Sequence, residues 1–275
     1  MTNIESGAER TRSAPGRRNF LVTNDDGIDS PGLWALARAC KPVADHVYVV
    51  APKTNQSAVG ASMTMRRELH WEQVKYPPVD GVEAWHVDGT PADCVNVALK
   101  SIVRHWVDIV VSGVNQGANV GRDTLASGTV GGALHGHFRG VTAAAFSLSV
   151  EPGKDVDWGP TERVAAAICK AEANDELPAS VFLNVNIPLV PYEELAGVLV
   201  TRVGRSGIME LANRSEHSGI LERTAQLTTD PKTPPGTDIW ALAHGYVSVS
   251  PLQSNLTDHG LMDALGQQLT MAFER

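Results

Sequence analysis

The sequence predicts an α/β fold in which a mostly parallel sheet carries helices on both faces. Through the first 190 residues, short apolar runs rich in β-favouring residues alternate with segments of helical periodicity. These runs are continuously hydrophobic rather than alternating, which indicates strands that are buried on both faces. At 275 residues, the chain is long enough for one large domain, or for a domain with an extension.

The expected strands and helices follow one another in the order typical of parallel sheets. The helix at 30–40 has the clearest beginning, because Ser30 is a suitable N-cap and proline is favoured at the next position. Strands are predicted at 20–23, 46–52, 107–113, 141–150 and 181–188, and a second helix is predicted at 161–173.

The character of the chain changes near residue 190. Residues 206–236 are polar, residues 237–252 alternate as antiparallel strands do, and the last apolar pattern is helical. These segments offer little core of their own, so we expect a β-hairpin and helix extension that is used in oligomerisation. The predicted organisation is a disordered tail at 1–18, an α/β core with the active site at 19–190, and a C-terminal arm and helix of the same domain at 191–275.

Composition excludes several classes of protein. The 23 basic residues are outnumbered by 31 acidic ones, which gives a net charge of −8. This charge argues against binding of a large nucleic acid, because its phosphate backbone requires a basic surface. No apolar run reaches the length of about 18 residues that a membrane span needs. The three cysteines are scattered, which favours reduced thiols in a cytoplasmic protein, and the Arg-rich start lacks the features of an export signal.

The stretch "FLVTNDDG" at 20–27 places two carboxylates directly after a buried strand. Asn, Asp and Gly are common turn residues, so a plain turn is one interpretation. The other is a metal site at the carboxyl edge of the sheet. Neighbouring side chains of a regular strand point to opposite faces, but a turn eased by Gly27 would let Asp25 and Asp26 face one ion.

Two further polar loops follow strands of the predicted sheet. The loop "KTNQSAVGAS" carries Ser57, and "SGVNQGANVGRDTLASGTVGG" begins directly after the apolar run "DIVV" at 108–111. Ligands of open α/β sheets bind outside the carboxyl ends of the strands, where these loops would meet. Their carboxylate, hydroxyl and amide oxygens suit magnesium, manganese or calcium better than structural zinc.

The third loop also has features of a phosphate site. It is rich in glycine and enters a predicted helix, whose N-terminus would present free amides to an anion, with Ser127 and Thr129 as possible hydroxyl donors. Its spacing matches neither a Walker loop nor G-x-G-x-x-G, and a plain glycine-rich turn before a helix is the alternative.

The motifs together resemble the SurE-type survival-protein nucleotidases. The resemblance rests on "LVTNDDGIDSPGLWAL", "VVAPKTNQSAVGASMT", "DGTPADCVNVAL", "DIVVSGVNQGANVGRDTLASGTVGGALHG", "LNVNIP", "TRVGR" and "GTDIWALAHGYVSVSPLQSNLT", in the same order from about residue 20 to 257. It implies a Rossmann-like α/β domain whose C-terminal elements are exchanged within a homodimer or homotetramer. It also implies a phosphatase that acts on nucleoside 5′- and 3′-monophosphates with one divalent cation per subunit.

The resemblance also implies which residues form the site. The metal ligands fall on Asp25, Asp26, Ser57 and Asn115, and the phosphate-binding residues fall on Asn119, Ser127, Gly128 and Thr129. The expected catalytic residues are Asp25 and Asp26 with Asn119, Ser127 and Thr129.

This chain departs from the family pattern at two positions, which bear on substrate preference. Ala126 stands where the family usually has an aromatic residue, and His135 stands where it usually has an acidic one. His135 and His137 are also candidates for a general acid, although single histidines more often pack in the core or on the surface.

The expected mechanism is attack of a metal-activated water on phosphorus. A covalent aspartyl-phosphate, formed by attack of Asp25 or Asp26, is the alternative.

Two other classes remain open as alternatives for the function. A dinucleotide-dependent oxidoreductase would have a G-x-G-x-x-G turn where this chain has its acidic pair, and a metal- or nucleotide-binding regulator would bind without releasing phosphate.

Overall fold

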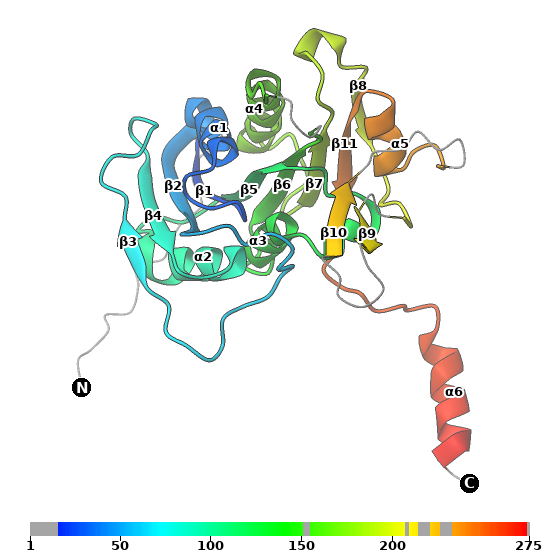
Figure 1. Cartoon of the computed structure of the whole chain (residues 1–275). Coiled ribbons are helices and arrows are strands. Elements are labelled where there is room, and N and C mark those ends of the chain that lie inside the picture. Colours follow the sequence, from blue (N-terminus) through cyan, green and yellow to red (C-terminus); the bar gives the residue numbers. More distant parts are fainter. Residues whose placement is uncertain (1–15, 151–154, 207–208, 214–220, 226–232, 274–275) are drawn as a thin grey trace, which may run out of the picture.

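The computed structural model describes residues 16–150, 155–206, 209–213, 221–225 and 233–273. One nine-stranded sheet dominates it, in the order β3-β4-β2-β1-β5-β6-β7-β11-β8 (Figure 1). The strands are β1 (Arg18–Thr23), β2 (Ala44–Pro52), β3 (Trp71–Gln73), β4 (Glu83–Val87), β5 (Ile109–Gln116), β6 (Thr142–Leu148), β7 (Phe182–Ile187), β8 (Gly197–Val200) and β11 (Tyr246–Pro251). Antiparallel pairing occurs where β3 joins β4 and where β11 joins β7, and the other neighbours are parallel.

Helices cover both faces of the sheet, which confirms the predicted α/β fold. The helices are α1 (Pro31–Cys40), α2 (Pro91–Val97), α3 (Gly128–His137), α4 (Gly159–Ala173), α5 (Asp238–Ala243) and α6 (Met262–Phe273), with short turns η1 (Lys41–Val43), η2 (Ala98–Ile102), η3 (Gly121–Leu125) and η4 (Tyr192–Glu194). Figure 1 shows α1 and α4 on one face and α2 and α3 on the other, and each pair is in contact. Every helix among the described residues falls short of the length and apolarity needed to cross a bilayer.

The two faces of β1 explain the continuous hydrophobicity of the first strand. Phe20 packs into the core beneath α1 and α4, whereas Leu21 packs with Val95 of α2 on the opposite face. Successive side chains of a strand alternate between its faces, so a strand that is covered on both sides needs apolar residues at every position.

The beginning of the described chain is anchored to the sheet. β1 starts at Arg18, the last residue of the predicted tail, and residues 1–15 of that tail lie outside the described residues. The Arg18 side chain is 1% exposed, and its Nη2 lies 2.7 Å from Oδ1 of Asp175. A buried guanidinium requires such a partner, which places Arg18 within the fold.

Two predicted helices are confirmed. α1 begins after Ser30, which occupies the N-cap position with Pro31 next to it, although the Ser30 side chain makes no capping hydrogen bond. α4 begins at Gly159 and ends at Ala173, where the predicted helix ends.

The prediction of strands throughout 237–252 is wrong, because its first half is helix α5. The hydroxyl of Thr237 accepts a hydrogen bond from Trp240 N at 3.4 Å and caps this helix, and Asp238 stands in its first turn. Ile239 and Leu242 then bury one face of the helix. A strand forms only at β11, which pairs with β7 and β8 in the main sheet.

The polar segment at 206–236 contributes two strands, β9 (Met209–Asn213) and β10 (Leu221–Ala225), which pair antiparallel in a separate two-stranded sheet. Residues 207–208, 214–220 and 226–232 of this predicted arm lie outside the described residues. The predicted C-terminal helix is confirmed as α6, and Figure 1 shows it clear of the rest of the molecule.

Candidate functional site

The acidic pair lies in a tight turn directly after β1. The Asn24 side chain closes this turn, because its Nδ2 donates to Gly27 O at 2.9 Å and its Oδ1 accepts from Gly27 N at 3.2 Å. Gly27 has φ +103°, a left-handed conformation that glycine adopts at little cost. Asp25 and Asp26 are therefore held at the carboxyl end of a central strand, as the sequence predicts.

Asp25 is buried against the N-terminus of α3. Its side chain is 4% exposed, and its Oδ1 accepts a hydrogen bond from Thr129 Oγ1 at 2.5 Å. A Cβ atom at Gly128 would lie 2.8 Å from Asp25 Cβ, so only glycine allows the helix to approach this closely. Burial raises the pKa of Asp25 to about 6, the Thr129 bond opposes this rise, and the charge of Asp26 adds to it.

Asp26 connects the turn to the two other candidate loops. Its Oδ1 accepts from Asn55 Nδ2 at 3.3 Å, and its Oδ2 lies 3.5 Å from the backbone nitrogen of Gln116. The main chain adds a third connection, because Gln56 N donates to Asp25 O at 2.6 Å. Burial also raises the pKa of Asp26. The three polar loops thus meet at the acidic pair.

Ser57 and Asn115 lie on the segments that contact Asp26. The backbone nitrogen of Ser57 donates to Asn55 Oδ1 at 2.9 Å, and the Ser57 side chain is exposed. Asn115 follows an irregularity in the pairing of β5 with β6, and its Nδ2 donates to Gly117 O at 2.7 Å. That bond fixes the amide, while no described donor contacts its Oδ1, which can therefore accept a ligand.

Asn119 belongs to a buried network at the ends of β6 and β7. Its backbone nitrogen donates to Asn186 Oδ1 at 2.8 Å, and its Nδ2 donates to Ser147 Oγ at 2.8 Å. Its carbonyl accepts from Asn184 Nδ2 at 2.8 Å and from Asn186 Nδ2 at 3.1 Å. These three partners were not predicted from the sequence. For Asn184 and Asn186 the signal was present as polar residues at alternate positions of "LNVNIP", within an otherwise apolar strand.

The phosphate-site candidates of α3 have different surroundings. Ser127 is the N-cap, and its Oγ accepts from Val130 N at 3.2 Å, which leaves the hydroxyl hydrogen available. Thr129 is fully buried and its hydroxyl donates to Asp25. In this arrangement Thr129 orients the carboxylate, whereas Ser127 and the amide of Gly128 form the start of the helix.

The donor set fits a hard divalent cation. Within the described part of the chain, neither carboxylate of the pair is bonded to an Arg or a Lys side chain. Two neighbouring carboxylates, one buried and one half-buried, need a compensating charge, which a cation can provide. The described residues contain no group of three His, Cys, Asp or Glu that could hold a metal, so hydroxyl and amide oxygens would complete the coordination.

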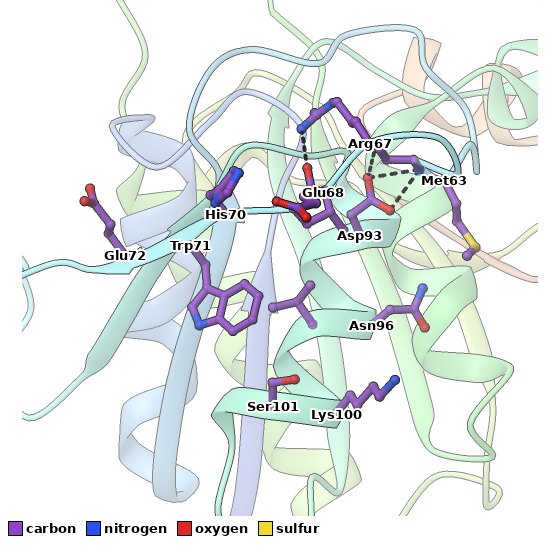
Figure 2. A pocket seen from close by; sticks show the side chains of 13 residues that line it. Met63, Arg67, Glu68, His70, Trp71, Glu72, Asp93, Asn96, Lys100 and Ser101 are labelled. Atoms are coloured by element: carbon purple, nitrogen blue, oxygen red, sulfur yellow. Dashed lines mark hydrogen bonds between the residues drawn. The ribbon is translucent and has the colours of Figure 1, made fainter.

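Two of the cavities in the structure differ in their relation to the candidate site. A cavity of about 880 Å³ lies between residues 63–72 and α2 and includes none of the candidate residues (Figure 2). A second cavity, of about 370 Å³, is lined by Ser127 together with apolar side chains such as Leu125, Leu134 and Leu252. The second one adjoins the N-terminus of α3 and therefore the candidate site.

Comparison with known proteins identifies the family. Residues 20–210 match the family model described as Survival protein SurE. A 5′-nucleotidase SurE of Dehalococcoides mccartyi is 38% identical over 242 residues, covering 86% of this chain and 89% of the relative. The 5′-nucleotidase SurE 1 of Thermus thermophilus is 41% identical over 247 residues, covering 90% and 96%.

A solved structure agrees with these sequence relatives. The crystal structure of the SurE protein from Aquifex aeolicus superposes with a TM-score of 0.78 at 35% sequence identity, covering 91% of this chain and 99% of that one. The fold, the matched residues and the relatives agree with the resemblance of the motifs, and the chain belongs to the SurE family.

Proposed function

We propose that this protein is a divalent-metal-dependent phosphomonoesterase that releases phosphate from nucleoside 5′- and 3′-monophosphates. The observation that carries the proposal is the buried Asp25 beside Asp26, at the end of a central strand and against the first turn of α3. The names of the relatives, 5′-nucleotidase SurE, support the class of substrate.

In this proposal, Asp25, Asp26, Ser57 and Asn115 hold one divalent cation per subunit. Such a cation, for example Mg²⁺ or Mn²⁺, would supply Lewis-acid stabilisation of the phosphoryl group and lower the pKa of a coordinated water. Thr129 occupies Oδ1 of Asp25, which would leave the other carboxylate oxygen for the ion. Asn55 and the backbone of Gln116 constrain the Asp26 carboxylate through its two oxygens.

The phosphate group is assigned to the N-terminus of α3 and to Asn119. Ser127 and the backbone amide of Gly128 would donate to phosphoryl oxygens, where the helix dipole favours negative charge. The network around Asn119 fixes its backbone, so its side chain is oriented before a substrate arrives. Water is the proposed nucleophile rather than Asp25, because that carboxylate is already bonded to Thr129 and assigned to the cation.

Helix α6 supports assembly into a homodimer or homotetramer. None of its residues is buried, and Leu265, Leu269 and Phe273 are among its exposed large side chains. A helix that stands clear of the body with an apolar face gains stability by packing on another subunit.

The proposal is tested by phosphate release from nucleoside 5′- and 3′-monophosphates, a short polyphosphate and an aryl phosphate. Each is assayed with Mn²⁺, with Mg²⁺ and with a chelator. We expect release that depends on metal and falls more than about 100-fold in Asp25→Asn. Asp29→Asn removes an exposed carboxylate of the same loop and should retain activity.

Binding of metal and nucleotide without release from any ester would contradict the enzymatic proposal. That result would favour the regulator as the function of this site.

A further inference from the structure

The orientation of the Asn96 amide is fixed from two sides. Its Nδ2 donates to Ala92 O at 2.8 Å along α2, and its Oδ1 accepts from Arg139 Nη2 at 2.9 Å. Figure 2 shows Asn96 and the buried Asp93 on α2 beside the larger cavity. Because Arg139 can only donate, the oxygen of the amide must face it. The second hydrogen of Nδ2 is then directed elsewhere.

That hydrogen is received by His135 of α3. The Nδ1 atom of His135 lies 2.9 Å from Asn96 Nδ2, so Nδ1 must accept and carries no proton. The other ring nitrogen, Nε2, lies 3.3 Å from Ala61 O, a carbonyl that can only accept. The neutral form with hydrogen on Nε2 is the one form that satisfies both contacts. Both ring nitrogens are engaged, so this histidine is not placed to act as a general acid.

Ala61 belongs to the loop that carries Ser57. In this loop, Ala58 has φ 61° and Gly60 has φ 59°, both in the left-handed region. A non-glycine residue there costs energy and persists when surrounding contacts fix it. The loop lies directly on α3, because a Cβ atom at Gly131 would lie 2.3 Å from Gly60 O. Contacts between α3 and this loop therefore help to fix where Ser57 lies.

We propose that His135 is a positioning residue, which in its neutral Nε2–H form holds the 55–61 loop, and with it Ser57, against α3. The inference rests on the proposed function, in which Ser57 is a metal ligand.

The surroundings of His135 favour the neutral ring. His135 is 7% exposed, and its burial lowers the pKa of the ring. The Arg139 charge also lowers this pKa, whereas the Ala61 contact and the Asp93 carboxylate raise it. Protonation of Nδ1 would place two donors face to face, since Asn96 cannot turn without losing Ala92 and Arg139. Protonation therefore costs the contact with Asn96, whereas the Nε2–H group can donate to Ala61 O in either form of the ring.

Two substitutions distinguish the contact made by Nε2 from the contact made by Nδ1. In His135→Gln, the longer amide can still donate to Ala61 O, whereas in His135→Asn the shorter side chain can accept from Asn96 but cannot reach the loop. His137→Gln is the control on the same helix, because the His137 ring stacks on Phe182 of β7.

The first readout is hydrogen exchange of amides 57–62, with amides of β5 and β6 as the internal reference. Loss of one neutral hydrogen bond should speed exchange of the loop by about 3- to 10-fold in His135→Asn, with little change in His135→Gln or the control. The second readout is Mn²⁺ affinity, which should weaken by a similar factor in His135→Asn alone. Equal behaviour of the Asn and Gln variants in both readouts would overturn the proposal.

A measurement on the wild-type chain is independent of any variant. Nitrogen-15 NMR should identify His135 as the neutral Nε2–H form at neutral pH, whereas a proton on Nδ1 would overturn the proposal. Hydrogen exchange and NMR do not depend on catalysis or on metal binding. If the wild-type protein neither bound Mn²⁺ nor released phosphate, the proposed function would fail, and these two measurements would still test the role of His135.

Discussion

Asp25 is buried and has a charged neighbour, and this combination makes its ionised form unfavourable when no cation is bound. Its carboxylate receives one side-chain hydrogen bond, from Thr129, while Asp26 lies next to it in the chain. A buried acid with a like charge nearby resists ionisation. In the proposed function these features would favour binding of a divalent ion, because binding would relieve the repulsion and replace lost hydration.

The cost of Asp25 should appear in the pH dependence of stability in chelator. The folded pKa of this carboxyl is about 6 against an ordinary value of 3.8, so the group favours folding fully below pH 3.8, and that contribution is lost as pH rises through about 6. The difference corresponds to roughly 3 kcal/mol at 1.36 kcal/mol per pH unit. Thermal stability should therefore fall more steeply from pH 4 to 8 in the wild type than in Asp25→Asn, and parallel profiles would contradict this.

Gly128 is a second residue whose chemistry can be tested alone. In Gly128→Ala the new methyl group would meet Asp25 Cβ at 2.8 Å, so the helix must move away from the acidic pair. We expect a loss of about 1–3 kcal/mol in the free energy of unfolding, together with reduced phosphate release. Gly266→Ala in α6 is the matched control, since nothing lies within 4 Å of its added atom and alanine favours helix. A stable, fully active Gly128→Ala protein would be inconsistent with the close contact.

Strands β6 and β7 act together on the third loop. Ser147 and Asn186 are paired across these strands, and both contact Asn119. Asn186→Ala would leave the buried Asn119 amide without its acceptor, which should cost about 1–3 kcal/mol of stability and lower activity. Asn174→Ala, which removes an exposed asparagine bonded to Glu176, is the control for urea unfolding and phosphate release. Equal stability of the two variants would exclude the network as an anchor of the loop.

The end of the sheet shows where local sequence patterns lose their predictive value. Alternating polarity at 237–252 predicted strands, but the Thr237 cap and the packing of Ile239 and Leu242 produce helix α5 first. Asp238 then accepts from Gly121 N at 2.7 Å and from Gly204 N at 2.9 Å. This long-range role has no local signature, because an aspartate at a helix start is explained equally well as a cap.

The central elements were more predictable for a physical reason. Strands buried on both faces must be apolar throughout, and the turn after β1 needs Asn24 and Gly27, so composition and order alone locate the acidic pair. The contact of Thr129 with Asp25 joins residues 104 positions apart. Such a contact depends on how α3 docks, which the sequence pattern does not specify.

At the scale of the whole molecule, helix α6 stands clear of the other elements (Figure 1). If α6 packs on a second copy, Leu265→Glu combined with Leu269→Glu should convert the assembly to folded monomers, because both side chains lie one helical turn apart on an exposed face. Light scattering coupled to size exclusion measures this mass, and Gln267→Glu adds charge elsewhere on the helix as a control. An unchanged mass for the double variant would exclude α6 as the interface.

A divalent cation at Asp25 and Asp26 is central to the proposed activity of the whole molecule. The most direct test is a titration of Mn²⁺ into metal-free protein, with phosphate release from a nucleoside 5′-monophosphate measured at each step. We predict activity that rises in proportion to one bound ion per chain, and neither binding nor release in Asp25→Asn. Full release by the metal-free wild type, or by Asp25→Asn, would contradict this role of the cation.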